Sequence, residues 1–357
     1  MIATALALGA LAAPLVAATS YPLKDSWSGD GFIDGWDYPA ATYDNTTSGD
    51  VFWATSANTS LIYVNDAGRV VLKVDNTSTV AYNEKRYAPE LISKTGYAAG
   101  TVFVMDAVHL PYGCSVWPSF WTQGTDWPTN GEIDIFEGVN LQTTNQMALH
   151  AEGNGCYASD SVTFSGSMQN TNCSTSYNSN EGCSVLDNST ASYGAAFASA
   201  GGGVFVAEYA EEWIKIWFIT RDSVPSSLSS NATTIDTDDL GTPSAYYPSS
   251  TCDIDTYFGD QRMTLDITLC GSWAGTASVL EETCDALVGD ATCYTTYVEG
   301  TQTTTYANAY FEINYVNVYT NASTSTSSSS SSAASSRSVV QYGAVAGVAA
   351  AVIALLI

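Results

Sequence analysis

The chain has 357 residues, and its 36 acidic against 10 basic side chains give it a formal net charge of −26. So negative a surface repels a phosphate backbone, which argues against nucleic-acid binding and favours a neutral or cationic ligand. Aromatic residues, among them 9 Trp and 22 Tyr, make up 12% of the chain. Such rings fill β cores and also stack on sugars, and composition alone does not separate the two.

The chain begins with an apolar run that ends in the small residues Val16, Ala17 and Ala18. An apolar segment followed by small residues is typical of a secretory signal peptide, although the usual basic residues before the apolar run are missing. We therefore expect residues 1–18 to be a signal peptide and the folded body to span residues 19–320.

Residues 19–320 contain a succession of short runs rich in β-branched and aromatic residues, separated by turn residues. The runs are residues 61–64, 69–74, 101–105, 203–207, 213–218 and 309–319. Their alternation is typical of strands, and no long helical period accompanies them. Many short strands in one body predict an all-β domain of two packed antiparallel sheets.

A further segment, residues 130–138, carries three acidic residues, Glu132, Asp134 and Glu137, within six positions. They are interleaved with large apolar residues. In a strand, Glu132 and Asp134 point to one face, and a β-bulge near Phe136 returns Glu137 to that face. The pattern predicts three carboxyl groups on one concave surface, with the glutamates near the ~5–5.5 Å spacing of retaining glycosidases.

Such a trio can divide the two roles that retaining hydrolysis needs. One carboxylate attacks the anomeric carbon while a protonated carboxyl releases the leaving oxygen. Neighbouring acids differ in pKa because like charges disfavour joint ionisation. We therefore predict Glu132 as the nucleophile, Glu137 as the general acid and then base, and Asp134 as a hydrogen-bonding neighbour of Glu132.

Two other interpretations of the acidic segment are a solvent-facing strand and a calcium site. A solvated strand seldom interleaves its acids with Ile and Phe, and calcium loops follow another pattern. Both interpretations are therefore weaker than catalysis.

The segment 131–138, GEIDIFEG, resembles the signature of glycoside hydrolase family 16 in its laminarinase-like E-x-D-x-x-E form. Further segments resemble the same family in the same order: residues 114–121, 147–150, 217–225, 252–255, 265–275 and 309–313. The resemblance implies a β-jelly-roll sandwich with an open concave substrate cleft. It also implies endo-acting, retaining hydrolysis of β-1,3- or mixed β-1,3/1,4-glucan. We expect no cofactor and identify no metal site.

The resemblance also implies which side chains line the cleft. By motif, Trp117, Trp121 and Trp273 stack against sugar rings, and His150 lies near the cleavage point. Without the resemblance, each Trp would be taken as core and His150 as a satisfied buried histidine. Trp127, just before the acidic segment, is expected at the cleft rim.

The cysteines and glycosylation sequons agree with a secreted protein. Eight cysteines, no C-x-x-C pair and only two histidines indicate disulfides rather than a zinc site, with the pairing left open. The cysteines are Cys114, Cys156, Cys173, Cys183, Cys252, Cys270, Cys284 and Cys293. Sequons predict glycosylation at Asn45, Asn58, Asn76, Asn188, Asn231 and Asn321.

The C-terminal sequence changes composition twice. Residues 321–336 are a Ser/Thr-rich tract that cannot bury a core and is expected to form a stalk. Arg337 and an apolar run over residues 339–357 follow. Small residues, a polar spacer and an apolar stretch predict a GPI-attachment signal over residues 337–357, removed on attachment. A transmembrane helix is the alternative, but Gln341 interrupts the run and no basic anchor follows it.

Three functions therefore remain in competition. The first is a GPI-anchored endo-β-glucanase at the cell surface, a monomer that contacts the membrane only through its lipid. The second is a wall-remodelling transglycosylase of the same fold, although such relatives typically carry the shorter E-x-D-x-E spacing. The third is a non-catalytic glucan-binding protein, which is ranked last because both glutamates are present.

Overall fold

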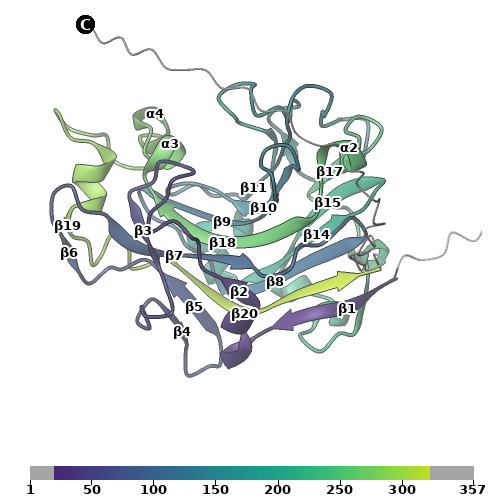
Figure 1. Ribbon diagram of the computed structural model, residues 1–357, viewed down its shortest axis with the longest axis horizontal. Coiled ribbons are helices and arrows are strands. Elements are labelled where there is room, and N and C mark those ends of the chain that lie inside the picture. Colours follow the sequence, from purple (N-terminus) through teal and green to yellow (C-terminus); the bar gives the residue numbers. More distant parts are fainter. Residues whose placement is uncertain (1–19, 322–357) are drawn as a thin grey trace, which may run out of the picture. The chain divides into compact units, whose positions relative to one another are not determined.

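The computed structural model describes residues 20–321, which form two large β-sheets packed face to face (Figure 1). The predicted signal peptide, most of the Ser/Thr tract and the predicted GPI signal lie outside the described residues. Within residues 20–321, no helix has both the length and the apolar character needed to cross a membrane.

The first sheet, here called the back sheet, has nine strands centred on β20 and β8. Its main order is β16 (Thr234–Asp236), β1 (Ser20–Trp27), β20 (Tyr310–Thr320), β8 (Thr101–His109), β14 (Gly203–Tyr209), β15 (Trp213–Thr220) and β17 (Ala245–Pro248). Strand β5 (Val70–Lys73) also pairs with β20 and carries β4 (Ile62–Val64) at its other edge.

The second sheet, here called the site sheet, also has nine strands and contains the acidic segment. Its order is β12 (Ser167–Met168), β13 (Cys183–Leu186), β11 (Gln146–His150), β10 (Glu132–Glu137), β9 (Val116–Gly124), β18 (Gln261–Leu269), β7 (Arg86–Ser93) and β2 (Trp36–Asp37). Strand β3 (Val51–Ala54) pairs with β7 in parallel, whereas the other pairings of this sheet are antiparallel.

The remaining elements are short. Strands β6 (Thr79–Val80) and β19 (Gly300–Thr301) form a separate ribbon. The helices are α1 (Gly194–Ser199), α2 (Ile254–Tyr257), α3 (Gly271–Ala274) and α4 (Ala277–Leu280). Single turns are η1 (Gly29–Gly31), η2 (Ile33–Gly35), η3 (Thr190–Ser192), η4 (Arg221–Ser223), η5 (Ser226–Leu228), η6 (Thr237–Leu240) and η7 (Tyr294–Val298).

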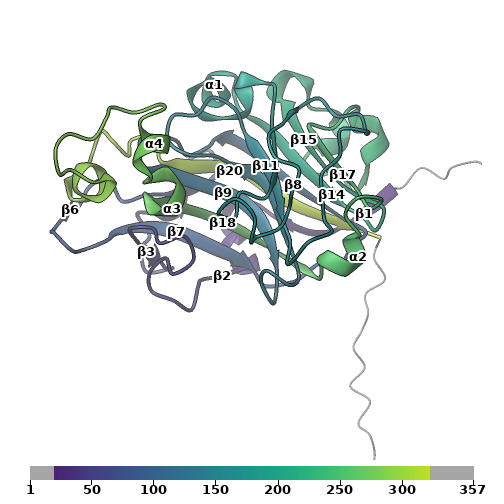
Figure 2. The same cartoon turned by 90° about the horizontal axis from the view of Figure 1, so that it is seen from above.

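The apolar faces of the two sheets meet in one core. Seen from above, β9, β18 and β7 of the site sheet lie over β8 and β20 of the back sheet (Figure 2). Phe136 of β10 is fully buried, with its ring centroid 5.3 Å from that of Phe205 on β14 and 6.1 Å from that of Phe311 on β20. Each such buried side chain contributes about 1.5–3 kcal/mol. The predicted all-β sandwich of two antiparallel sheets is confirmed.

All eight cysteines form disulfides, which settles the pairing that the sequence left open. The pairs are Cys114–Cys284, Cys156–Cys252, Cys173–Cys183 and Cys270–Cys293. Three of them join segments 23 to 170 residues apart, so they tie long loops to the sheet ends. The fourth closes a loop of ten residues between β12 and β13.

Candidate active site

The three predicted carboxyl groups are positioned by a β-bulge in β10. On the β9 side, the pairing passes from Asp134 directly to Phe136, which leaves Ile135 as the extra residue. Both Ile135 and Phe136 are buried in the core, whereas Glu132 and Glu137 are partly exposed. The predicted bulge near Phe136 is thus present, and the acidic side chains share the face that points away from the core.

Glu137 forms hydrogen bonds with three residues. Its Oε1 accepts from Trp117 Nε1 at 2.8 Å and from Ser119 Oγ at 3.4 Å, while its backbone N–H donates to Asn145 Oδ1 at 2.9 Å. Burial raises the pKa of Glu137 to about 7, against the opposing effects of the Trp117 hydrogen bond and the charge of His150. Near neutral pH this carboxyl can therefore both give and take a proton.

Glu132 has a different environment at the other end of the strand. Its Oε2 accepts a hydrogen bond from Trp127 Nε1. Trp127 itself is 45% exposed, in agreement with its expected place at a rim. The two glutamates therefore differ in their hydrogen-bond partners, Trp127 for Glu132 and Trp117 with Ser119 for Glu137.

His150 and Asp134 form a buried pair beside the two glutamates. His150 Nε2 lies 3.2 Å from Asp134 Oδ2. The two atoms form an ion pair, but their geometry is not that of a hydrogen bond. Burial by itself would lower the pKa of His150, but the charges of Glu132, Asp134 and Glu137 raise it to about 10. We therefore place a proton on each ring nitrogen in the neutral range.

The same residues were tested as a metal site. Glu132, Asp134 and His150 each offer one ligand atom, and these atoms lie within 4.8 Å of one another. However, an imidazolium donates from both nitrogens and has no lone pair for a cation. His150 Nε2 instead faces Asp134 Oδ2 at 3.2 Å.

The predicted aromatic residues lie around the acidic group. Trp117 and Trp273 are both half-buried and meet edge to face, with ring centroids 5.4 Å apart. Trp121, four residues further along β9, is also half-buried and donates its Nε1–H to Asp266 Oδ1 at 2.8 Å. The structure thus places Trp117 and Trp121 on β9, the neighbour of β10, and Trp273 on α3, where its ring meets that of Trp117. Their role in stacking on sugars remains a prediction.

A second pair of carboxyl groups lies on this sheet and was not predicted from the sequence. Strand pairing places Glu137, Ser119, Asp266 and Glu90 in one row across four neighbouring strands. Burial, then the charge of Asp44, raises the pKa of Glu90 to about 8. Burial, then the charge of Glu90, raises the pKa of Asp266 well above its usual range. The alternation of polar residues along β18 was the available signal.

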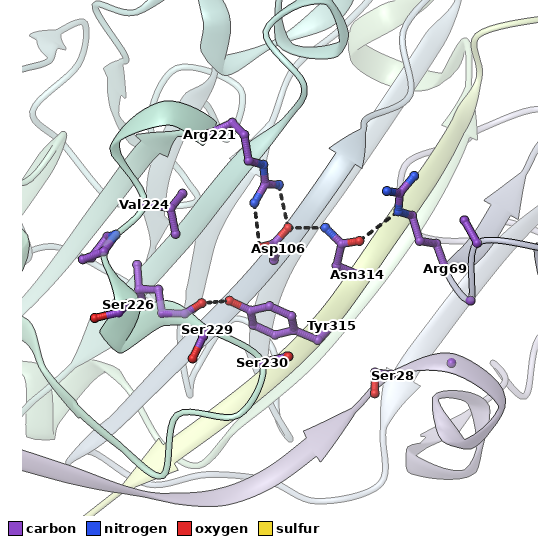
Figure 3. A pocket seen from close by; sticks show the side chains of 15 residues that line it. Ser28, Arg69, Asp106, Arg221, Val224, Ser226, Ser229, Ser230, Asn314 and Tyr315 are labelled. Atoms are coloured by element: carbon purple, nitrogen blue, oxygen red, sulfur yellow. Dashed lines mark hydrogen bonds and ion pairs between the residues drawn. The ribbon is translucent and has the colours of Figure 1, made fainter.

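The back sheet carries a cavity of about 630 Å³ on a different part of the molecule (Figure 3). Its central carboxylate, Asp106, accepts from Arg221 at 2.8 and 2.6 Å and from Asn314 Nδ2 at 2.6 Å. Figure 3 shows these groups joined in one network that continues to Arg69. Because the carboxylate oxygens are already paired, we interpret this network as structural.

The six predicted glycosylation positions are accessible. Asn45, Asn188, Asn231 and Asn321 are exposed, and Asn58 and Asn76 are partly exposed. Their occupancy remains a prediction.

Comparison with known proteins places the chain in a family. The model of the XgeA-like catalytic GH16 domain matches residues 36–319. The chain therefore belongs to glycoside hydrolase family 16. This confirms the resemblance and the enzyme class that the acidic segment indicated.

Curated fungal relatives agree with this assignment. A probable glycosidase of Schizosaccharomyces pombe is 37% identical over 314 residues, which cover 86% of this chain and 71% of the relative. The endo-1,3(4)-beta-glucanase xgeA of Emericella nidulans is 32% identical over 87% of this chain and 47% of the relative. The chain thus spans about half the length of several curated relatives that it matches.

Two solved structures share the fold and have 35% sequence identity to this chain. The GH16 laminarinase 16A from Phanerochaete chrysosporium, solved with two β-glucans in donor and acceptor sites, is 35% identical with a TM-score of 0.77. The comparison covers 84% of this chain and 99% of that one. An elongating GH family 16 β-1,3-glucosyltransferase is also 35% identical, with a TM-score of 0.75, over 84% of this chain and 100% of that one.

Proposed function

We propose that the chain is an endo-acting, retaining hydrolase of β-1,3- or mixed β-1,3/1,4-glucan. The observation that carries the proposal is the bulge in β10, which sets Glu132 and Glu137 on one face with the buried pair of Asp134 and His150 beside them. The named activities of the fungal relatives support the choice of substrate.

In the proposed mechanism Glu132 is the nucleophile and Glu137 is the acid and then the base. Glu137 donates its proton to the glycosidic oxygen while the Glu132 carboxylate attacks the anomeric carbon, which forms a covalent glycosyl-enzyme. Glu137, now ionised, then takes a proton from the water that attacks this intermediate. A pKa of about 7 suits a group that performs both steps.

The neighbouring residues would orient these two groups. The indole N–H of Trp117 fixes Glu137 Oε1, and Asn145 holds the backbone of Glu137. The indole N–H of Trp127 contacts Glu132. The cationic His150 partly offsets the mutual repulsion of the three carboxyl groups.

The first test is the effect of Glu132→Gln on hydrolysis and on glucan binding. We expect cleavage of laminarin and of barley mixed-linkage glucan to vanish while the unfolding temperature and glucan binding persist. The exposed Glu282→Gln serves as the matched control and should keep full activity. Retained hydrolysis by Glu132→Gln would overturn the proposal.

A second candidate function is glucan transfer. A solved relative at 35% identity is described as an elongating β-1,3-glucosyltransferase, and a retaining intermediate can be intercepted by a sugar instead of water. Product length separates the two functions. Only shorter products from laminarin mean hydrolysis, whereas products longer than the donor mean transfer.

We also propose that the protein is secreted as a monomer and attached to the cell surface by a GPI anchor. The four disulfides support an oxidising compartment. The anchor rests on the composition of residues 321–357. Phosphatidylinositol-specific phospholipase C should release the protein from intact cells, and failure to release it would contradict the anchor.

A further inference from the structure

The second ring nitrogen of His150 is engaged by a residue from outside the acidic strand. His150 Nδ1 lies 3.0 Å from Asn180 Oδ1, while Nε2 faces Asp134 on the opposite side of the ring. Asn180 belongs to the loop before β13, is exposed to solvent, and has no part in the mechanism proposed above.

The loop that carries Asn180 adopts a conformation that L-residues rarely take. Asn178, Ser179 and Asn180 have successive φ values of 44°, 57° and 65°. This region of backbone space is unfavourable for residues with a Cβ, although Asn tolerates it better than most. The run turns the chain so that the Asn180 amide reaches the imidazole.

Several contacts fasten this loop to the end of β11. The disulfide Cys173–Cys183 closes it, and the backbone N–H of Ala151 donates to Cys173 O at 2.8 Å. Gly182 lies directly against the histidine, since a Cβ added there would be 2.7 Å from His150 Cε1 and Nε2. The loop therefore packs on the imidazole itself, and its approach requires glycine at that position.

We propose that Asn180 is a positioning residue of the active site. Its amide oxygen fixes the ring orientation and the Nδ1–H of His150, and through His150 it holds Asp134 beside the catalytic glutamates. This inference rests on the proposed function for its meaning, but the contact itself stands on geometry.

The chemistry of the ring explains why an amide is suited to this place. Nδ1–H donates to Asn180 and Nε2–H faces the Asp134 carboxyl group, and both nitrogens carry a proton only in the imidazolium. The titratable groups that face the imidazole are Glu132, Asp134 and Glu137 of β10.

Two further titratable groups lie on elements packed near the ring. Tyr247 of β17 donates its hydroxyl to the backbone oxygens of Met147 and Cys183. Glu181 in the loop accepts from Asn178. Neither contact supplies an acceptor for Nδ1, so loss of the Asn180 oxygen leaves Nδ1–H without the acceptor that holds it.

The test uses the fact that the chain has only two histidines. Nitrogen-15 NMR of the side chains in the folded, substrate-free protein reports which ring nitrogens are protonated. His109 stacks on Tyr310 with ring centroids 3.7 Å apart, and burial lowers its pKa. Its signals, assigned with His109→Gln, therefore titrate separately and serve as an internal reference.

Two substitutions at the same position give opposite expectations. Asn180→Ala should lower the pH midpoint of the His150 signals and reduce kcat about tenfold with little change in KM, as expected for one lost positioning hydrogen bond. Asn180→Asp keeps an acceptor of the same shape and adds a charge, so the midpoint should rise and kcat should be retained better. Tyr177→Phe is the control at an exposed position of the same loop and should leave the His150 signals unchanged.

Unchanged His150 signals in both Asn180 variants would overturn the inference, whatever the enzyme hydrolyses. Because the NMR titration needs no substrate, failure of the glucanase assignment leaves this result readable. If Asn180→Ala fails to fold, the pH midpoint of the His150 signals in Asn180→Asp decides the question. A higher midpoint supports the inference, and an unchanged or lower midpoint contradicts it.

Discussion

The hydrogen bond from Trp117 to Glu137 offers the sharpest quantitative test of the proposed acid. Trp117→Phe removes the indole N–H that lies 2.8 Å from Glu137 Oε1 but retains an aromatic ring against Trp273. The N–H favours the ionised carboxylate, so its loss must raise the pKa of Glu137 above its value of about 7.

The size of the effect follows from the type of bond. A hydrogen bond to a charged group contributes about 1.5–3 kcal/mol, and ~1.4 kcal/mol corresponds to one pKa unit. The weaker contact from Ser119 Oγ, at 3.4 Å, remains and offsets part of the loss. We expect the pKa of Glu137 to rise by about one unit.

The assay is the dependence of kcat/KM on pH with laminarin as substrate. Activity needs Glu137 protonated in the free enzyme, so its pKa sets the alkaline limb of the profile. The alkaline limb of Trp117→Phe should move to higher pH by about one unit, while the acid limb moves little.

Trp213→Phe is the matched control for this experiment. Trp213 also donates its Nε1–H to a glutamate at 2.8 Å, Glu208, but on the back sheet. Its pH profile should be that of the parent. An alkaline limb that stays in place or moves to lower pH in Trp117→Phe would refute the assignment of Glu137 as the acid, or its contact with Trp117.

Three further predictions concern stability and site geometry. Glu137→Gln should be inactive but more stable than the parent protein at pH 8. The pKa of Glu137 is 4.5 in the unfolded chain and about 7 in the folded protein. The protonated carboxyl group therefore stabilises the fold fully below pH 4.5, and this stability is lost as pH rises through about 7. The gain is at most ~3 kcal/mol at pH 8 and near zero at pH 4, measured by denaturant unfolding. Gly182→Ala places a Cβ 2.7 Å from the His150 ring at a φ of +69°, so activity should fall and the unfolding free energy should drop by about 1–2 kcal/mol. Phe136→Ala should lower the unfolding free energy by about 3–5 kcal/mol, since its buried ring extends from the site sheet to Phe205 and Phe311 of the back sheet. A loss under about 1 kcal/mol would contradict this packing.

The sequence alone predicted the features that depend on neighbouring residues. A strand has a period of two, so the alternation of Glu132 to Phe136 already indicates an acidic face, a core face and the bulge that returns Glu137 to the acidic one. The same local rule located β4, β5, β8, β14, β15 and β20 to within a few residues. The family signature then indicated the fold and the enzyme class.

Features that depend on distant segments required the tertiary structure. Asp266 and Glu90 are 176 positions apart in the chain, and only the pairing of β18 with β7 places them in the row that leads to Glu137. Disulfide pairing also depends on distant segments, because Cys114 and Cys284 meet only when their loops fold together.

The protonation of the site also belongs to the folded state. An Asp or a Glu has its ordinary pKa in an open chain, and it is burial that raises the pKa of Glu137 to about 7. No local sequence pattern predicts that Asn180, thirty positions after His150, faces Nδ1 of that histidine. The sequence thus determined which chemical groups lie on one strand. The packing of the sheets and loops decided the partners and the charge of those groups, because contact and desolvation arise only in the folded protein.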